Sequence, residues 1–439
     1  MRTTFQHDLF GGVDYWRNAP VRTQIVAGFC LGSLALLGVL NLLPHVLSGH
    51  PRAIAVDFTA FWAAGQAWGQ GFSPYGPEYA AIIAESGAPA LHAPPPPYFY
   101  PPNSILLALP FSALGYADAS ASFAIVNAAA FICAAWGFAA VVAKPADGAR
   151  SLDVNSVRIR IIVLASIFVG VAGAVWTAAE VVFLHNTPAF AIYAAGFFSL
   201  AAIRDRKIGL LTVCLTITLM KPQLGAPLLL VALLSPSTRP AGLYAVAVTG
   251  CLAGAGLLAG APGSLVDFLV NLTAYGDYPE NAALNTSGAG HLIAVLVNLD
   301  ISSFALLVAL FAAQLVAHAT ADRDLRGAED WPLRFAAFSL IAAAAILPSH
   351  NNYHLALAPA FFLIPATARE KALLAGAAIA TMFAWQIGEA LSAVGVFYLQ
   401  RNAAMIDTIS IAIILYAART LVRGAAHSPK PISMQESVA

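Results

Sequence analysis

Apolar runs long enough to cross a lipid bilayer recur along this chain and restrict its fold more than any other feature. A membrane-spanning helix needs roughly 20 apolar residues, and Gln24–Leu47, Ser120–Val142 and Ala372–Val394 all reach this length. Only 10% of the residues are charged, whereas soluble domains carry about 25%. A soluble protein of this composition could not cover its surface with polar groups, so the sequence predicts an integral membrane protein.

The fold class we expect is all-α, a polytopic membrane bundle of about twelve spans. Residues 1–422 would form a single transmembrane domain, and residues 423–439 a polar, disordered cytoplasmic tail. We see no soluble domain, internal repeat or heptad pattern.

Basic residues gather in short stretches, for example around Arg158. The positive-inside rule assigns these stretches to the cytoplasm of an inner-membrane protein, which leaves the Lys- and Arg-poor loops 48–102 and 262–290 on the extracytoplasmic side. If Ser104–Leu114 and Ser120–Val142 both crossed the membrane, Arg158 would fall on the wrong side. We therefore expect one of these two runs to be re-entrant, or both to share one crossing.

The first external loop opens with a single acid, Asp57. Behind it, Phe58, Phe61, Trp62 and Trp68 follow a helical spacing, which predicts a helix lying in the membrane interface with its aromatics at headgroup depth. Asp57 could simply cap this helix, since Asp is favoured at that position. The alternative is a functional role, because ionisable groups near a membrane are costly.

Further polar groups interrupt apolar sequence on the same predicted side. Asn186 precedes a new run, where it could cap a helix. Lys221 stands at an outer helix end, where it could extend to the interface or bind a phosphate group. His350, Asn351 and His354 lie together at a proline-broken helix end. The second external loop, 262–290, reads as a lid or an acceptor surface.

The sequence lacks the motifs that are typical of several other classes of protein function. The four cysteines lie in apolar segments without metal-ligand spacing. We find no phosphate-binding loop and no domain that could hold a nucleotide sugar. Lys and Arg together number 22, as do Asp and Glu, so nothing indicates a nucleic-acid partner. We expect neither a metal ion nor another cofactor.

Four short motifs follow one another along the chain. They are an acid directly after the first span (Asp57), a Gly-x-x-Pro-Tyr turn (Gly71–Tyr75), a Tyr-Pro-Pro segment leading into a proline-containing run (Tyr100–Pro102 with Pro110), and a later Lys-Pro (Lys221–Pro222). The order of these motifs resembles glycosyltransferase family 87. The family's Gly-Gln-x-Asn-like element is replaced here by His185–Thr187, which is a departure from the pattern.

The resemblance implies a GT-C-type bundle whose active site faces the extracytoplasmic side. It also implies a polyprenyl-phosphate sugar donor, with mannose as the family's usual sugar, and an inverting transfer without metal. By position, Asp57 is the general base. The acceptor could be a glycolipid, a polysaccharide or a protein. The protein itself is expected to contact membrane lipids.

The remaining site residues are assigned by their chemistry. Lys221, His350 and His354 are expected to contact the donor phosphate or sugar, and Tyr75, Tyr100, Asn186 and Asn351 to shape the sugar pocket. Two other functions stay open. A transporter or flippase would use Asp57 as a gate or proton-coupling group, and a non-catalytic assembly factor would tolerate substitution of these polar residues.

Overall fold

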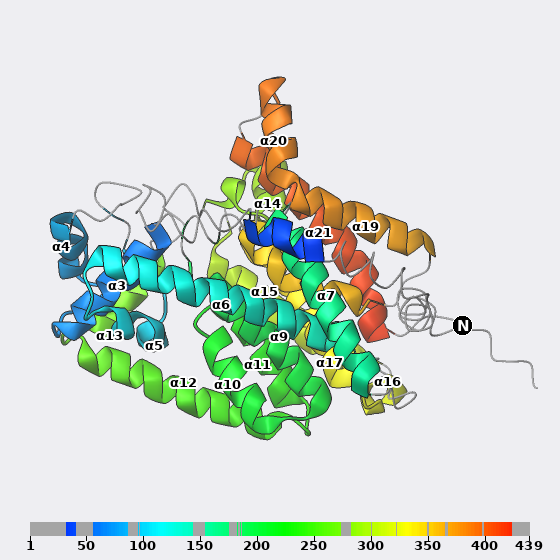
Figure 1. Ribbon diagram of the computed structural model, residues 1–439, viewed down its shortest axis with the longest axis horizontal. Coiled ribbons are helices and arrows are strands. Elements are labelled where there is room, and N and C mark those ends of the chain that lie inside the picture. Colours follow the sequence, from blue (N-terminus) through cyan, green and yellow to red (C-terminus); the bar gives the residue numbers. More distant parts are fainter. Residues whose placement is uncertain are drawn as a thin grey trace, which may run out of the picture.

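The computed structural model describes residues 32–40, 56–86, 95, 97–143, 154–174, 182, 185, 187–273, 282–299, 301–321, 323–348, 351–364, 368–396 and 399–423. Every element in this part of the chain is a helix (Figure 1), which confirms the all-α prediction. The elements are α3 (Val56–Gly69), α4 (Pro77–Ser86), η1 (Pro102–Ser104), α5 (Ile105–Ala108), η2 (Leu109–Phe111), α6 (Tyr116–Val142), α7 (Val154–Ala174), α9 (Ala189–Asp205), α10 (Ile208–Thr218), α11 (Pro222–Leu234), α12 (Arg239–Ala259), α13 (Ser264–Thr273), η5 (Ala283–Asn285), α14 (Ala289–Val297), α15 (Ser303–Thr320), α16 (Arg323–Gly327), α17 (Trp331–Ile346), η6 (Asn351–Leu357), α18 (Ala358–Phe362), α19 (Ala368–Met382), α20 (Ala384–Ala393) and α21 (Leu399–Arg423).

Fewer helices are long enough to cross a bilayer than the apolar runs predict. Among the described residues, α6, α12, α15 and Arg401–Val422 of α21 have the required length and composition. The pair α19 and α20, bent by 68°, adds a fifth if it forms one broken span. Three neighbouring helices are shorter than a bilayer crossing: α9 has 17 residues, α10 11 and α11 13. The described residues therefore do not confirm the expected twelve spans, and most of the run Gln24–Leu47 lies outside them.

The run Ser104–Leu114 is one of these divided segments. It folds as η1, α5 and η2, of which α5 has only four residues. Pro110 lies at the start of η2, and proline cannot donate the hydrogen bond that would continue a helix. The segment packs against α3 and is too short to cross a bilayer. Among the described residues from 97 to 143, α6 is the one helix that is long and apolar enough to cross a bilayer. A single crossing there is consistent with the predicted cytoplasmic position of Arg158.

The buried residues form a large core between the membrane helices and a smaller one around α3. We call the smaller one the loop core: Phe58, Phe61, Trp62, Ala63, Ala64, Trp68, Tyr75, Tyr79, Ile83, Tyr98, Ile105, Ala108, Ala119 and Phe123. Its centre is Tyr98, which is fully buried and whose hydroxyl is 2.7 Å from Ser104 Oγ. Residues 56–86 and 97–111 therefore pack, together with the start of α6, into a unit that can hold a side chain in a fixed position.

The prediction that α3 presents its aromatics to the membrane interface is wrong. Phe58, Phe61, Trp62 and Trp68 are all at most 6% exposed. Trp62 donates its indole N–H to the Leu114 carbonyl at 3.0 Å. The i, i+3, i+4 spacing marks a buried helix as well as an interfacial one, because both need an apolar face, and here protein covers that face.

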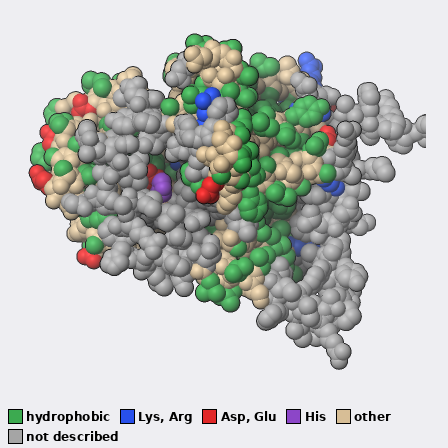
Figure 2. All heavy atoms as spheres, turned by 90° about the horizontal axis from the view of Figure 1, so that it is seen from above, with side chains coloured by type: hydrophobic (Ala, Val, Ile, Leu, Met, Phe, Trp, Pro, Cys, Tyr) green, Lys and Arg blue, Asp and Glu red, His purple; other side chains and the backbone are tan. Residues whose placement is uncertain are grey.

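The outer surface carries many exposed hydrophobic side chains, as expected for a membrane protein. Figure 2 shows a continuous area of hydrophobic side chains on one face of the molecule, and several carboxylates at the end that carries α4 and α13 in Figure 1. Exposed large apolar side chains occur on α6, α12 and α15, for example Ile132, Leu258 and Phe304. An exposed apolar surface of this extent requires lipid.

Candidate active site

Asp57 lies in the first turn of α3, inside the helix and not at the residue that precedes it. Its Oδ2 atom is 3.9 Å from Nδ1 of His185, and the side chains of Asp57 and His185 are 41% and 34% exposed. The N–H of Phe58 donates a hydrogen bond of 3.4 Å to the His185 carbonyl, which joins the two segments. The backbone bond between the two segments therefore holds Asp57 in a fixed position where a ligand can reach it.

Lys221 lies in the turn between α10 and α11. Pro222 begins α11, at a helix position where its missing N–H is not needed. Gly225 lets the chain reverse tightly, since a Cβ there would come within 2.6 Å of the Leu219 backbone. The reversal encloses Lys221, which is only 5% exposed.

The Lys221 ammonium is within electrostatic reach of Asp57. Burial lowers the pKa of Lys221 from 10.5 to about 7, and the negative charge of Asp57 opposes this shift. Asp57 also acts electrostatically on Tyr193 of α9, which is fully buried. We call Asp57, His185, Lys221 and Tyr193 the α3 cluster. It combines an accessible base with a buried cation, the pair of groups that a transfer to a hydroxyl from a phosphate ester needs.

Tyr75 and Tyr100 connect the loop core to this cluster. The Tyr75 hydroxyl donates a hydrogen bond of 2.9 Å to the Tyr100 carbonyl, and burial raises its pKa. The Tyr100 ring packs on Phe61 at 4.3 Å between centroids, and Tyr100 acts electrostatically on Tyr193. Tyr100 thus borders the α3 cluster, whereas Tyr75 supports the Tyr100 backbone.

His354 lies in a second polar group, which we call the α21 cluster: Ser287, His354 and Asp407. Its Nε2 atom is 3.2 Å from Ser287 Oγ, and its Nδ1 atom is 3.5 Å from Asp407 Oδ1. All three residues are at most 2% exposed. With the proton on Nδ1, the imidazole faces the carboxylate and its Nε2 accepts from the Ser287 hydroxyl.

The neighbouring backbone joins the segment before α14 to the same helix, α21. The Gly288 N–H donates a hydrogen bond of 3.1 Å to Thr408 Oγ1. Gly288 has a φ of 117°, and a Cβ there would come within 2.6 Å of the Leu347 carbonyl oxygen. Only glycine fits this position without strain. The α21 cluster therefore joins the loop end, η6 and α21.

Three predicted site positions cannot be placed beside these clusters. His350 and Asn186 lie outside the described residues. Asn351 begins η6, and its side chain lies outside the described part as well. The predicted tail from residue 424 onward is also outside. Their assigned roles stay predictions.

Three polar residues of these clusters were missed in the sequence: Tyr193, Ser287 and Asp407. Tyr193 and Asp407 lie within the apolar runs Pro188–Ile203 and Ala404–Val422, which were interpreted as uninterrupted spans. A single hydroxyl or carboxylate inside such a run is itself a signal, because it is costly there unless it has a partner. What the sequence cannot supply is the identity of that partner.

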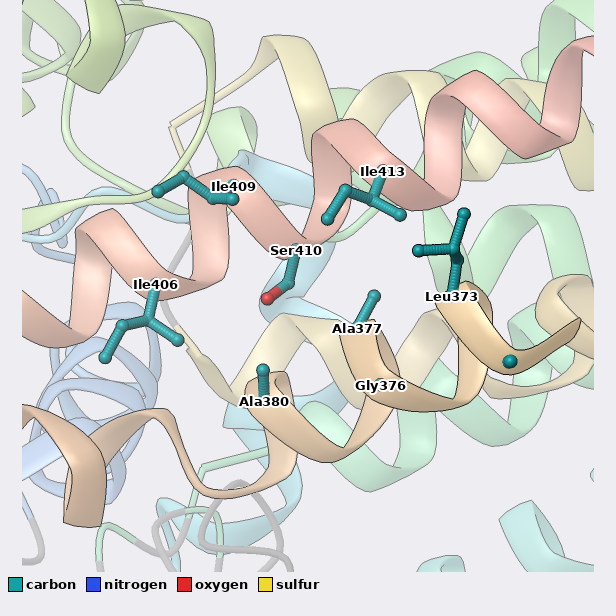
Figure 3. Close-up of a pocket in the computed structure, with 9 residues that line it drawn as sticks. Leu373, Gly376, Ala377, Ala380, Ile406, Ile409, Ser410 and Ile413 are labelled. Atoms are coloured by element: carbon teal, nitrogen blue, oxygen red, sulfur yellow. The ribbon is translucent and has the colours of Figure 1, made fainter. Parts of the chain in front are cut away.

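An apolar groove of about 400 Å³ lies between α19 and α21 (Figure 3). Leu373 and Ala377 line it from α19, and Ile406, Ile409 and Ile413 from α21. No charged residue and no member of the two polar clusters lines the groove. It suits a hydrocarbon chain and not a sugar or a phosphate.

Comparison with known proteins identifies the family. Residues 98–350 match the model of glycosyltransferase family 87. This segment contains Tyr100, His185, Tyr193 and Lys221, and it begins after Asp57. Searches of curated proteins and of solved structures returned no match. Because the matched segment is more than half of the 439 residues, the chain belongs to glycosyltransferase family 87 and is a membrane glycosyltransferase.

Proposed function

We propose that this protein transfers a sugar from a polyprenyl-phosphate donor to an acceptor hydroxyl, with inversion at the anomeric carbon and Asp57 as the general base. Mannose is the first sugar to test, because the family resemblance implies it. The observation that supports the proposal is that an accessible carboxylate, Asp57, acts electrostatically on a buried amine, Lys221.

In this reaction the acceptor oxygen forms a bond to the anomeric carbon while the bond from that carbon to the phosphate oxygen breaks. The acceptor proton passes to Asp57, and the electron pair of the broken bond leaves with the lipid phosphate. An inverting transfer needs one carboxylate, since no covalent intermediate forms. The leaving phosphate is already an anion, so it needs charge stabilisation more than protonation.

Lys221 is suited to supply that stabilisation. Burial disfavours the charged form of an amine, and this cost appears as the lowered pKa of Lys221, which the charge of Asp57 opposes. A donor phosphate beside it would restore the preference for the charged form. A Lys ammonium acts as a point charge on phosphate, and little water screens it at 5% exposure.

The proposed setting is a GT-C-type bundle in the inner membrane, with the α3 cluster on the extracytoplasmic side. Lipid-linked donors are delivered within the membrane, so no nucleotide-binding domain is required. Membrane lipids surround the bundle, and the acceptor is a glycolipid, a polysaccharide or a protein.

The decisive experiment is a transfer assay with the purified protein, polyprenyl-phosphate mannose and a membrane-lipid extract as acceptor. Asp57→Asn should lower the rate by about 10²- to 10⁴-fold, the usual contribution of a general base. Glu85→Gln is the matched control, since Glu85 is an exposed acid on the adjacent α4, and it should keep full activity. Addition of a chelator should leave the rate unchanged.

Full activity of Asp57→Asn would overturn the assignment of the base. Solute or lipid movement in liposomes, without any glycosidic product, would favour the transporter instead. Mass spectrometry of membrane glycolipids with and without the protein would name both the sugar and the acceptor from one mass difference.

A further inference from the structure

Helix α13 has an apolar face that no described part of the protein covers. Leu265, Val266, Leu269, Val270 and Leu272 are between 44% and 63% exposed. Their spacing places them on one side of a helix of ten residues. The helix contains a single charged residue, and it does not belong to this face.

The opposite face of α13 is fixed to the loop core. Ser73 Oγ donates a hydrogen bond of 3.0 Å to Asp267 Oδ2. Asn271 donates one of 3.1 Å to the Tyr75 carbonyl. The Phe268 ring packs on Tyr75 at 5.1 Å between centroids. Asp267 and Asn271 are thus bonded within the protein, and the exposed side of α13 is apolar except for Thr273 at its end, whose hydroxyl donates to the Val270 carbonyl at 2.7 Å.

The position of α13 in the chain indicates what meets this face. Residues 260–263 alone separate it from α12, a candidate membrane span that ends at Ala259. On α12, Leu243, Tyr244 and Leu258 are between 57% and 87% exposed, so lipid must surround that helix as well. An apolar surface that continues directly from a span faces the same solvent as the span.

We propose that α13 lies in the surface of the bilayer where α12 ends, with its exposed face in contact with lipid acyl chains. Its occupant is the membrane itself and not a protein partner. Amphipathic helices bind a bilayer surface in this way, with the apolar face at the boundary of headgroups and chains. In this proposal the interfacial helix is α13 and not α3, and α13 attaches the loop core to the membrane surface.

The test uses environment-sensitive fluorescent labels on the full chain. Val266→Cys and Leu269→Cys are each made in a background whose four native cysteines are replaced, and each is labelled with a nitrobenzoxadiazole dye. Glu85→Cys on α4 is the control, because that residue is exposed and charged. The proteins are reconstituted in phosphatidylcholine liposomes with or without lipids that carry a nitroxide on the acyl chain.

We expect labels at positions 266 and 269 to show blue-shifted emission and quenching by nitroxide lipids at least about twofold stronger than at position 85. Equal quenching at all three positions would overturn the proposal. Blue-shifted emission without lipid quenching would also overturn it, since protein, such as a second copy of the chain, would then cover the face. Thermal unfolding of each labelled variant confirms that the compared proteins are folded.

Discussion

Lys221 and Asp57 carry opposite charges in different surroundings, and this difference separates their proposed roles. Lys221 is 5% exposed and its pKa is lowered, whereas the Asp57 side chain is 41% exposed. A buried cation gains most from an anionic ligand, and an accessible carboxylate can meet an acceptor hydroxyl.

Donor binding should weaken as the pH rises above about 7, because Lys221 in the protein without bound donor then loses its proton. A bound phosphate raises the pKa of the Lys221 ammonium. The constant kcat/KM reports the protein without donor, whereas kcat reports the protein with donor bound, so kcat/KM should fall at a lower pH than kcat does. Both constants can be measured with polyprenyl-phosphate mannose between about pH 6 and about pH 9.

Lys221→Arg provides the check on this assignment. An arginine stays protonated throughout this range, so a variant that retains activity should lose the alkaline fall in kcat/KM. Lys207→Arg, at an exposed lysine between α9 and α10, should keep the wild-type profile. An unchanged alkaline fall in Lys221→Arg would show that another group titrates.

Among the helices, α3 depends on a close backbone approach to α5. A Cβ at Gly65 would come within 2.4 Å of the Ala108 carbonyl oxygen, and backbone cannot move away as a side chain can. Gly65→Ala should therefore lower stability by about 1–3 kcal/mol, the usual cost of overpacking, and should displace the first turn that carries Asp57.

Gly69→Ala is the matched control on the same helix. Its Cβ would lie 3.4 Å from the Ser112 hydroxyl, an ordinary contact, and alanine favours the helix. Thermal unfolding in detergent together with the transfer rate compares the two variants. Equal stability of both would contradict the close packing of α3 on α5.

At α21, the buried Asp407 should matter for stability more than for chemistry. Asp407→Ala removes the partner of His354 Nδ1, and breaking such a buried pair costs about 3–5 kcal/mol. Asp407→Asn keeps an oxygen acceptor and should lie between Asp407→Ala and the wild type. Ile409→Ala, at a 51% exposed neighbour, is the control. Chemical unfolding in detergent measures all three, and an unaffected Asp407→Ala would exclude the anchoring role.

At the scale of the whole molecule, the proposed orientation places α4 and the basic turn after α9 on opposite sides of the membrane. A membrane-impermeant maleimide applied to intact spheroplasts should label Glu85→Cys and not Lys207→Cys in a cysteine-free background. Both residues are exposed on the protein, so labelling depends only on whether the reagent reaches that side of the membrane. After permeabilisation both should react, and the reverse pattern would contradict the orientation.

The sequence determined the class of the protein. Long apolar runs and few charges suffice for a helical membrane protein, because the bilayer imposes length and hydrogen bonding on any chain. The order of Asp57, the Tyr-Pro-Pro segment and Lys221 led to the family. These features are local, so no knowledge of distant contacts was needed.

Only the tertiary structure decided which residues meet. Periodicity shows that one face of α3 is apolar, but not whether protein or lipid covers it, and the structure buries α3 and exposes α13. Nor does order along the chain show that Lys221 lies near Asp57 whereas His354 faces Asp407. These pairings depend on how helices far apart in sequence pack together. Packing is a property of the whole molecule, and no short segment carries it.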